Sequence, residues 1–389
     1  MGCQRGCQLF QTVKSEEMQI CMAGCKLKFA LVSAADAELM EFSVSDQFKT
    51  AAHDAGVTHG HAEVRLPQIG MSIKLTQPVN GKFRHITRRP AILILPGGAY
   101  AYCSDREADP VAFPYLQAGF QTFILRYSVG TDAVWPNPLE DVEQAMELIR
   151  TREDWNVAED RVAVIGFSAG GHLAAAAATM ARNRPNAAII GYGVVGHNVV
   201  GCNPTAPDTV KAVDGKTCPC FLFASRTDTV VPIQNSLDFM TALAAANVSI
   251  ESHIYAFGPH GFSTCDSAVR DPNRPFCDRT PHWVGDSIGW LRDMFGDFSD
   301  GDFAPPRCGS HFTDDNESHL SVDCTLGHLM GNETALRILE PLFRKAREMG
   351  FTAMDQIQHV PCRTLLEIAG LPAEKIEQID RMLRQIPNE

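Results

Sequence analysis

A serine between two glycines follows an apolar stretch near the middle of the chain. The residues Gly166-Phe-Ser168-Ala-Gly170 come directly after the apolar segment 161–165 and lead into an alanine-rich segment. A very tight turn from a strand into a helix needs such small residues, because neighbouring backbones approach closely while the serine hydroxyl projects outward. A helix that begins after Ser168 also directs backbone N–H groups at a developing oxyanion. The pattern predicts a serine nucleophile for acyl transfer.

A serine hydroxyl needs a general base, and that base needs a carboxylate to orient it. Asp228 follows the apolar segment 219–225, and His260 follows the strand-like segment 250–257. The carboxyl ends of parallel strands meet at one edge of a sheet, where ligand sites collect. We therefore expect Asp228 to hold His260 in the tautomer whose Nε2 can take the proton of Ser168. These three residues are the predicted catalytic triad.

A Pro-Gly-Gly turn after another apolar stretch could supply the oxyanion hole. Its glycines expose unhindered backbone at the end of a predicted strand, where a loop must donate N–H groups. We expect the donors to be the N–H groups of Gly98 and Ala169, with Gly97 or Ala99 as a further donor from the loop, and each such donor typically contributes about 3 kcal/mol. The next two residues, Ala99 and Tyr100, are predicted to contact the substrate.

Other patterns are weaker candidates for chemistry. The residues 191–196 match G-x-G-x-x-G, but no amphipathic helix follows them, so we interpret the match as a coincidental loop. His172 lies one turn into the predicted helix after Ser168, which favours a packing role over catalysis. Asp208 and Asp214 lie in a loop predicted to cover the site, and they are second choices for the acid of the triad.

Strand-like and helical segments alternate through the middle of the chain. The predicted strands are 71–78, 90–96, 121–128, 161–166, 187–195, 219–225 and 250–257. The predicted helices are 105–118, 138–152, 169–182, 234–246 and 282–296. This order predicts an α/β fold with a mostly parallel sheet covered by helices on both faces.

The chain is longer than one such domain needs, so we expect appendages. Residues 1–60 have weak periodicity and are predicted to be a poorly ordered N-terminal extension. The catalytic domain is predicted over 61–298, followed by a polar linker over 299–324. Apolar residues at helical spacing within 325–389 predict a small helical bundle there.

Bulk properties exclude several classes of function. The formal net charge of -12 opposes binding to nucleic acid or to anionic membranes, and no apolar run is long enough to cross a bilayer. No secretory signal is found, and thirteen scattered cysteines fit free thiols in a reducing cytoplasm. The C-x3-C pairs at Cys3/Cys7 and Cys21/Cys25 lack the flanking turns of zinc knuckles. We therefore expect a cytoplasmic protein with neither a metal nor a cofactor.

Several motifs together resemble the α/β-hydrolase esterases of the acetyl xylan esterase and short-chain esterase/lipase group. The similar motifs are L-P-G-G-A-Y at 95–100, S-D-R-E-A-D-P-V-A at 104–112, R-Y-S-V at 126–129, G-F-S-A-G-G-H-L-A-A at 166–175 and H-G-F-S at 260–263. The resemblance spans about 65–298 and implies an α/β-hydrolase fold that cleaves acetyl or other short acyl esters, often of plant carbohydrate, without a cofactor. It carries Ser168, Asp228 and His260 over as the triad. Ala99 departs from the family, in which a third glycine is common.

Residues and resemblance together predict a serine esterase for short-chain esters, with acetyl esters of carbohydrate as the expected substrates. A small molecule or an oligosaccharide ester is thus the expected partner, and homo-oligomerisation is left open. A serine peptidase of the same fold would use the same triad, but the chain lacks a recognisable propeller or long lid domain. A non-catalytic binding protein on this scaffold would usually have lost a member of the triad.

Overall fold

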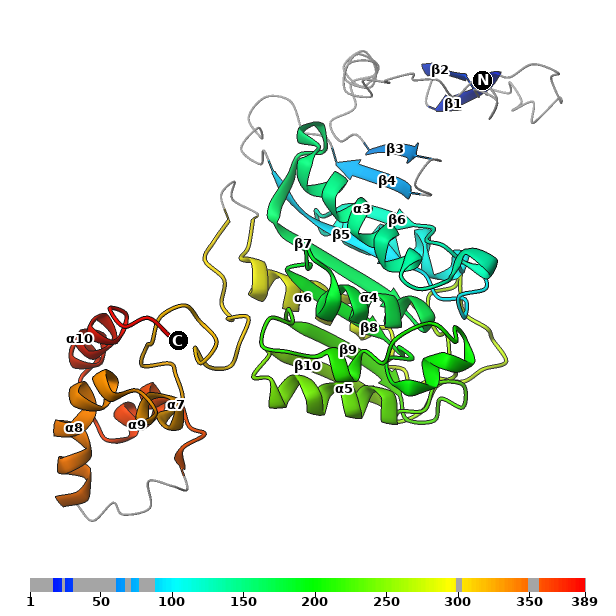
Figure 1. The fold of residues 1–389 in the computed structure, drawn as a ribbon. Coiled ribbons are helices and arrows are strands. Elements are labelled where there is room, and N and C mark those ends of the chain that lie inside the picture. The colour runs from blue at the N-terminus through cyan, green and yellow to red at the C-terminus, as the bar shows by residue number, and fades with distance from the viewer. Residues whose placement is uncertain are drawn as a thin grey trace.

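An eight-stranded sheet forms the centre of the protein. The computed structural model describes residues 17–22, 25–30, 61–66, 71–76, 88–298, 303–348 and 357–388. The strands are β3 (His61–Leu66), β4 (Met71–Thr76), β5 (Arg89–Leu95), β6 (Gln121–Leu125), β7 (Val157–Phe167), β8 (Ala187–Gly191), β9 (Cys220–Ser225) and β10 (Ile250–Tyr255). They lie in the order β10-β9-β8-β7-β5-β6-β4-β3 (Figure 1). The strands from β10 to β6 pair in parallel, whereas β4 and β3 join in antiparallel fashion.

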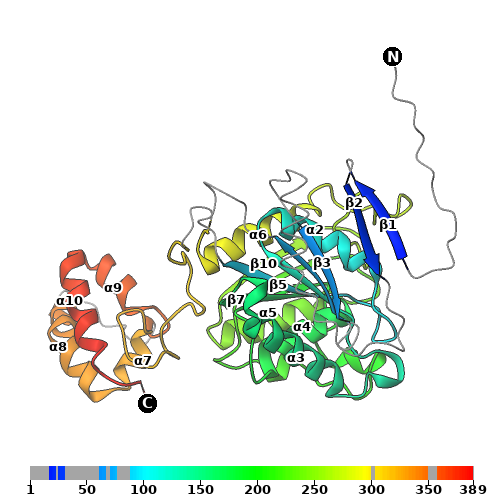
Figure 2. The same cartoon turned by 90° about the horizontal axis from the view of Figure 1, so that it is seen from above.

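Helices cover both faces of this sheet. The helices α3 (Asn137–Thr151), α4 (Ala169–Met180) and α5 (Gln234–Ala245) lie on one side. On the other side lie α2 (Asp109–Gln117) and α6 (His282–Phe295), as Figure 2 shows. Neighbouring residues of a strand face opposite sides, so Val164 of β7 packs in the α3–α4–α5 core and Ile165 in the α2–α6 core. The predicted doubly covered sheet is confirmed.

Two predicted elements differ from the structure for local reasons. The helix expected over 105–118 is a 3-10 turn, η3 (Asp105–Glu107), followed by α2. Pro110 favours a helix start at this point because it has no N–H to donate and a fixed φ. The strand expected over 187–195 ends at Gly191, since Tyr192 takes a φ of 36° that no extended strand can continue.

Helix α4 explains why the alanine-rich segment follows the serine. From Ala169 to Thr179 every residue of this helix is buried. Alanine has the highest helix propensity and a small side chain, so the helix can pack closely against β7, β8 and α3. The right-handed crossovers of a parallel sheet place the loops after β5, β7, β8, β9 and β10 at one edge. That carboxyl edge carries the predicted site.

The C-terminal residues form a helical bundle with its own core. Its helices are α7 (Leu326–Met330), α8 (Glu333–Glu348), α9 (Cys362–Ile368) and α10 (Ala373–Leu383). Leu329, Leu339 and Leu383 pack together in this core. Leu320 and Val322 belong to it as well, although they lie in the segment predicted as linker. The predicted helical appendage is therefore present.

The chain before β3 is described only in part. A hairpin of β1 (Glu17–Met22) and β2 (Cys25–Ala30) lies within the predicted extension 1–60, and the remainder of that prediction falls outside the described residues. The side chains of the C-x3-C cysteines also fall outside them. In the ranges that are described, no helix combines the length and apolar character that crossing a bilayer requires.

Candidate active site

Ser168 lies in the turn between β7 and α4. Its backbone has a φ of 53° and a ψ of -115°, an unusual conformation for a residue with a side chain. A Cβ at Gly166 would come 1.9 Å from the carbonyl oxygen of Gly170, and one at Gly170 would come 2.1 Å from that of Leu95. Only glycine fits at either position. The turn therefore forms the strained elbow that the small residues predict.

The structure brings the three predicted triad residues together at the carboxyl edge. The Nε2 of His260 lies 2.9 Å from the Oγ of Ser168, and its Nδ1 lies 2.7 Å from Oδ2 of Asp228. These residues follow β7, β9 and β10. In the sheet β9 and β10 are neighbours, and only β8 lies between β9 and β7. The contacts span 92 and 32 residues of sequence, and the sheet topology accounts for both.

Hydrogen-bond polarity fixes the protonation pattern of these groups. Oδ1 of the buried Asp228 accepts the N–H groups of Val230 at 2.8 Å and Val231 at 2.9 Å. An ionised carboxylate is an acceptor at both oxygens, so with Asp228 ionised Nδ1 of His260 donates its proton to Oδ2. Nε2 is then the acceptor for the hydroxyl of Ser168. This is the arrangement that a serine nucleophile and its general base require.

The oxyanion loop differs from the prediction at Gly97. Its N–H donates to Oε2 of Glu107 at 2.8 Å, so this group is not available to an oxyanion. By contrast, no acceptor among the described residues binds the N–H groups of Gly98, Ala99 or Ala169. The loop donors that remain are therefore Gly98 and Ala99. The predicted use of Gly97 as a donor is wrong because its N–H turns inward.

Backbone conformation and a tyrosine just after β6 hold this loop in place. Gly98 has a φ of 135°, and a Cβ there would come 2.0 Å from the carbonyl oxygen of Tyr102. Ala99 and Tyr100 also have positive φ values, 54° and 58°. The hydroxyl of Tyr127 donates to the carbonyl of Pro96 at 2.6 Å. The loop is thus fixed before any substrate arrives.

Glu107 is a buried carboxylate that links the loops around the site, and sequence reasoning missed it. Besides the Gly97 N–H on Oε2, its Oε1 accepts the hydroxyl of Tyr192 at 2.7 Å. The same hydroxyl oxygen accepts the N–H of Ser263 at 3.0 Å, and the Tyr192 ring lies edge-on to His260 at 5.1 Å. Burial raises the pKa of Glu107, while its hydrogen bonds to Tyr192 and Gly97 oppose that rise. The network connects the oxyanion loop with the loop that carries His260.

Tyr100 and Ala99 occupy different environments, although both were predicted to contact substrate. Ala99 is exposed beside the site. Tyr100 is only 2% exposed, and its hydroxyl donates to Nδ1 of His172 at 2.7 Å. The Tyr100 side chain therefore packs in the protein interior, where it supports the oxyanion loop, and it does not face a substrate. Nε2 of His172 donates to the carbonyl of Pro207 at 2.8 Å, as its predicted packing role requires.

Asp208 and Asp214, the alternative acids for the triad, interact with groups other than His260. Asp214 binds Arg184 at 2.6 Å, and this hydrogen bond lowers the pKa of Asp214 to about 2. Asp208 accepts the N–H of Val210 at 3.2 Å and lies 3.3 Å from the Nζ of Lys211. Neither carboxylate approaches His260 through a hydrogen bond, whereas Asp228 does. The segment 191–196 is a loop followed by a short 3-10 turn, so it is not a dinucleotide fingerprint.

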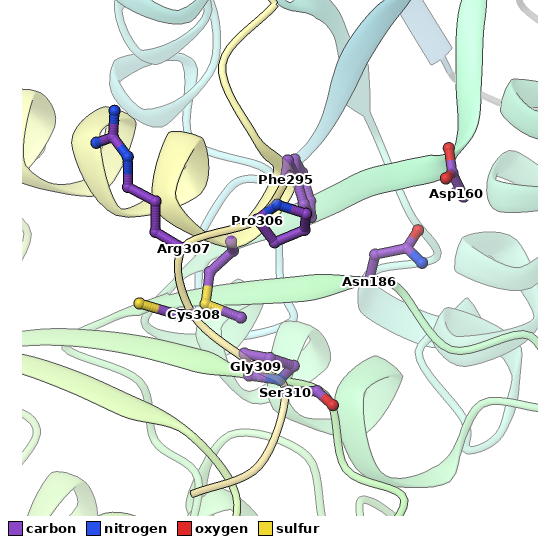
Figure 3. Close-up of a pocket in the computed structure, with 10 residues that line it drawn as sticks. Asp160, Asn186, Phe295, Pro306, Arg307, Cys308, Gly309 and Ser310 are labelled. Carbon is purple, nitrogen blue, oxygen red and sulfur yellow. The ribbon is translucent and has the colours of Figure 1, made fainter. Parts of the chain in front are cut away.

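Two cavities differ in their relation to this site. A groove of about 490 Å³ lies at the amino ends of β7, β8 and β9, between the sheet and residues 306–310 (Figure 3). It is on the edge opposite Ser168, and it contains no residue of the triad. A smaller cavity of about 40 Å³ is lined by His260 itself. Of these two cavities, only the smaller one is lined by a residue of the triad.

Comparisons with known proteins agree with this geometry. Residues 82–190 match the family model described as BD-FAE. Endo-1,4-beta-xylanase B of Butyrivibrio fibrisolvens is 26% identical over 211 residues, which are 46% of this chain and 33% of that protein. The acetylxylan esterase of Xylanibacter ruminicola is 29% identical over 198 residues, 44% of this chain and 41% of that protein. The chain thus matches less than half the length of these curated relatives.

A solved structure gives broader coverage. MGS-M1, an alpha/beta hydrolase enzyme from a Medee basin deep-sea metagenome library, is 35% identical with a TM-score of 0.55. The match covers 61% of this chain and 98% of MGS-M1. Because this identity extends over almost the whole of that hydrolase, the chain belongs to the α/β-hydrolase family.

Proposed function

We propose that the protein is a serine esterase that hydrolyses short-chain carboxylic esters. The observation that carries the proposal is the continuous hydrogen-bonded chain from Ser168 through His260 to Asp228. Next to it, the N–H groups of Gly98, Ala99 and Ala169 have no acceptor among the described residues. A nucleophile, its base and donors for an oxyanion are the parts that acyl transfer needs.

The reaction proceeds in two acyl-transfer steps. Ser168 attacks the ester carbonyl while Nε2 of His260 takes its proton, and Asp228 stabilises the imidazolium that forms. The tetrahedral oxyanion accepts hydrogen bonds from Ala169 and from the loop donors Gly98 and Ala99. His260 then protonates the leaving alcohol as the acyl-enzyme forms. Water enters next, gives its proton to His260 and releases the acid, so Ser168 regains its hydroxyl.

Acetyl esters of carbohydrate are the proposed natural substrates. Support comes from the similarity to an acetylxylan esterase and to a xylanase, which are named for xylan chemistry. The residues of the triad supply the whole reaction, so the proposal invokes no cofactor.

The test is hydrolysis of 4-nitrophenyl esters from acetate to decanoate by the wild type and by Ser168→Ala. We expect the wild type to prefer acetate and the variant to lose activity by several orders of magnitude, since the triad acts as one unit. Circular dichroism should show an unchanged fold in the variant. Turnover by Ser168→Ala at the wild-type rate would refute the serine mechanism, and a preference for decanoate would refute the short-chain assignment.

A further inference from the structure

The small cavity beside His260 is lined by three arginines. Arg106 of η3 lies on one side, and Arg270 and Arg274 come from the loop after the His260 segment. A single acid, Asp271, also lines the cavity. The whole chain carries a formal charge of -12, so a local excess of positive charge runs against its composition. Such an excess at the edge of an active site favours an anionic ligand.

Contacts within the protein hold two of the three arginines in place. Nη2 of Arg106 donates to the carbonyl of Val269 at 2.6 Å, which fastens η3 to the arginine-bearing loop. The guanidinium of Arg270 lies 5.1 Å from the centre of the Phe276 ring. A guanidinium that is held by a ring or a carbonyl loses less entropy when it binds a carboxylate.

The one acid of the cavity leaves the positive charge largely unbalanced. Asp271 approaches Nε of Arg274 only to 3.9 Å, too far for a hydrogen bond. Its Oδ1 accepts a hydrogen bond from the N–H of Asn273 at 2.9 Å. Asp266, the nearest other acid in this loop, accepts from Thr264 and Ala268. Neither Arg106 nor Arg270 forms an ion pair with a carboxylate in the described part of the chain, and the buried Glu107 is the acid whose charge interacts with Arg106.

The position of the cavity indicates which part of the substrate would fill it. The leaving alcohol receives its proton from His260, so it must lie beside that imidazole in the first step. The cavity is lined by His260 and the adjoining residues Pro259 and Gly261. Its volume of about 40 Å³ exceeds the roughly 10–15 Å³ that holds one water molecule, so it admits a group of a few atoms, such as a carboxylate.

We propose that this arginine cavity (Arg106, Arg270 and Arg274) is a subsite for a carboxylate on the alcohol part of the ester. The natural substrate is then an acyl ester of an acidic sugar or of another carboxylate-bearing alcohol. This inference rests on the proposed esterase function and adds the charge of the alcohol to it. A bound carboxylate would also offset the repulsion between the arginines and the imidazolium that forms on His260.

A matched pair of acetate esters tests the subsite. 5-Acetoxy-2-nitrobenzoate releases a nitrophenol that carries a carboxylate, and 5-acetoxy-2-nitrobenzamide releases its neutral isostere. We expect kcat/KM for the acid to exceed that for the amide about tenfold, after correction for their alkaline hydrolysis rates, as charge-assisted hydrogen bonds predict. The ratio should fall toward one in high salt, because the arginines are exposed.

Variants show whether the arginines cause the preference. Arg274→Glu should bring the ratio below one, and Arg270→Gln should lower it severalfold. Arg182→Gln is the matched control, since this exposed arginine pairs with Glu143 at the far end of α4, and its ratio should equal that of the wild type. Chemical denaturation of each variant shows that the fold persists.

The outcomes separate the two proposals. If neither ester is hydrolysed in a manner that depends on Ser168, the esterase function itself fails. If both esters are hydrolysed but the ratio is near one and does not respond to salt, the esterase function stands and the carboxylate subsite is overturned. An acid preference that survives Arg274→Glu and Arg270→Gln also overturns it.

Discussion

Replacing Glu107 by glutamine changes one buried group between the oxyanion loop and the His260 loop. Both oxygens of Glu107 accept hydrogen bonds, from the Gly97 N–H at 2.8 Å and from the Tyr192 hydroxyl at 2.7 Å. The Tyr192 oxygen already accepts the N–H of Ser263, so its own proton must point at Glu107. A glutamine offers one oxygen and one NH₂ group, so one of these two donors would face another donor.

The magnitude follows from the loss of one acceptor in a buried place. An unsatisfied buried donor costs about 1 to 3 kcal/mol, and Glu107 is only 5% exposed. If the oxyanion loop moves so that the unsatisfied donor finds another acceptor, the N–H groups of Gly98 and Ala99 shift away from the position of the oxyanion. Their hydrogen bonds to the transition state then weaken. A loss of about 1 to 3 kcal/mol in the transition state lowers kcat roughly 5- to 150-fold. KM should change little, because the ground-state ester does not depend on these donors.

Steady-state kinetics with 4-nitrophenyl acetate, together with thermal unfolding, measures both effects. Glu143→Gln is a matched control, since it removes a carboxylate that binds Arg182 at the surface, and its kcat should stay at the wild-type value. A Glu107→Gln enzyme that unfolds at a lower temperature but keeps the wild-type kcat would refute the positioning role. In that case the network would stabilise the fold alone.

Three further predictions concern the triad, the elbow and a buried histidine. Asp228→Asn should lower kcat about 10⁴-fold with the fold intact, because an amide stabilises the wrong tautomer of His260; stopped assays at high enzyme concentration measure this, and a loss below tenfold would contradict it. Gly170→Ala should lower the unfolding temperature strongly, since its Cβ would come 2.1 Å from the carbonyl oxygen of Leu95; calorimetry showing no shift would contradict the elbow geometry. Burial lowers the pKa of His172 to about 4 from an ordinary 6.5, so the unfolded chain binds a proton before the native protein does. Stability is therefore lost as the pH falls from 6.5 toward 4, by about 3 kcal/mol at most, and urea unfolding of His172→Gln should show a weaker dependence over this range.

The parts of the site that the sequence predicts are those that strand order determines. Ser168, Asp228 and His260 each follow an apolar strand, and parallel strands bring their carboxyl ends to one edge whatever the loops do. The strand pattern therefore predicts their proximity without any knowledge of side-chain contacts. The same reasoning identifies the loop at Gly98, because it follows β5, the neighbour of β7 in the sheet.

The features of the site that the sequence does not predict depend on the conformations of individual loops. Tyr100 turns into the core because both it and Ala99 take positive φ, and no pattern of residue types shows this. Glu107 lies in a segment of acids and arginine that is typical of a solvated turn, yet its carboxylate is buried. Its partner Tyr192 is 85 residues away, within a glycine motif that indicates only a loop.

The oxyanion loop must both donate and be anchored, which explains why Ala99 and not Gly97 is the second loop donor. A loop that donates to an oxyanion must also be held still, and a rigid loop needs acceptors inside the protein for some of its own N–H groups. Gly97 lies against the nucleophile, where a Cβ would come 3.1 Å from that of Ser168, and its N–H points inward to Glu107. The positive φ of Gly98 then turns the chain, so that the next N–H groups are left without an internal acceptor. One glycine thus anchors the loop and the following residues donate, which a sequence of two glycines alone does not distinguish.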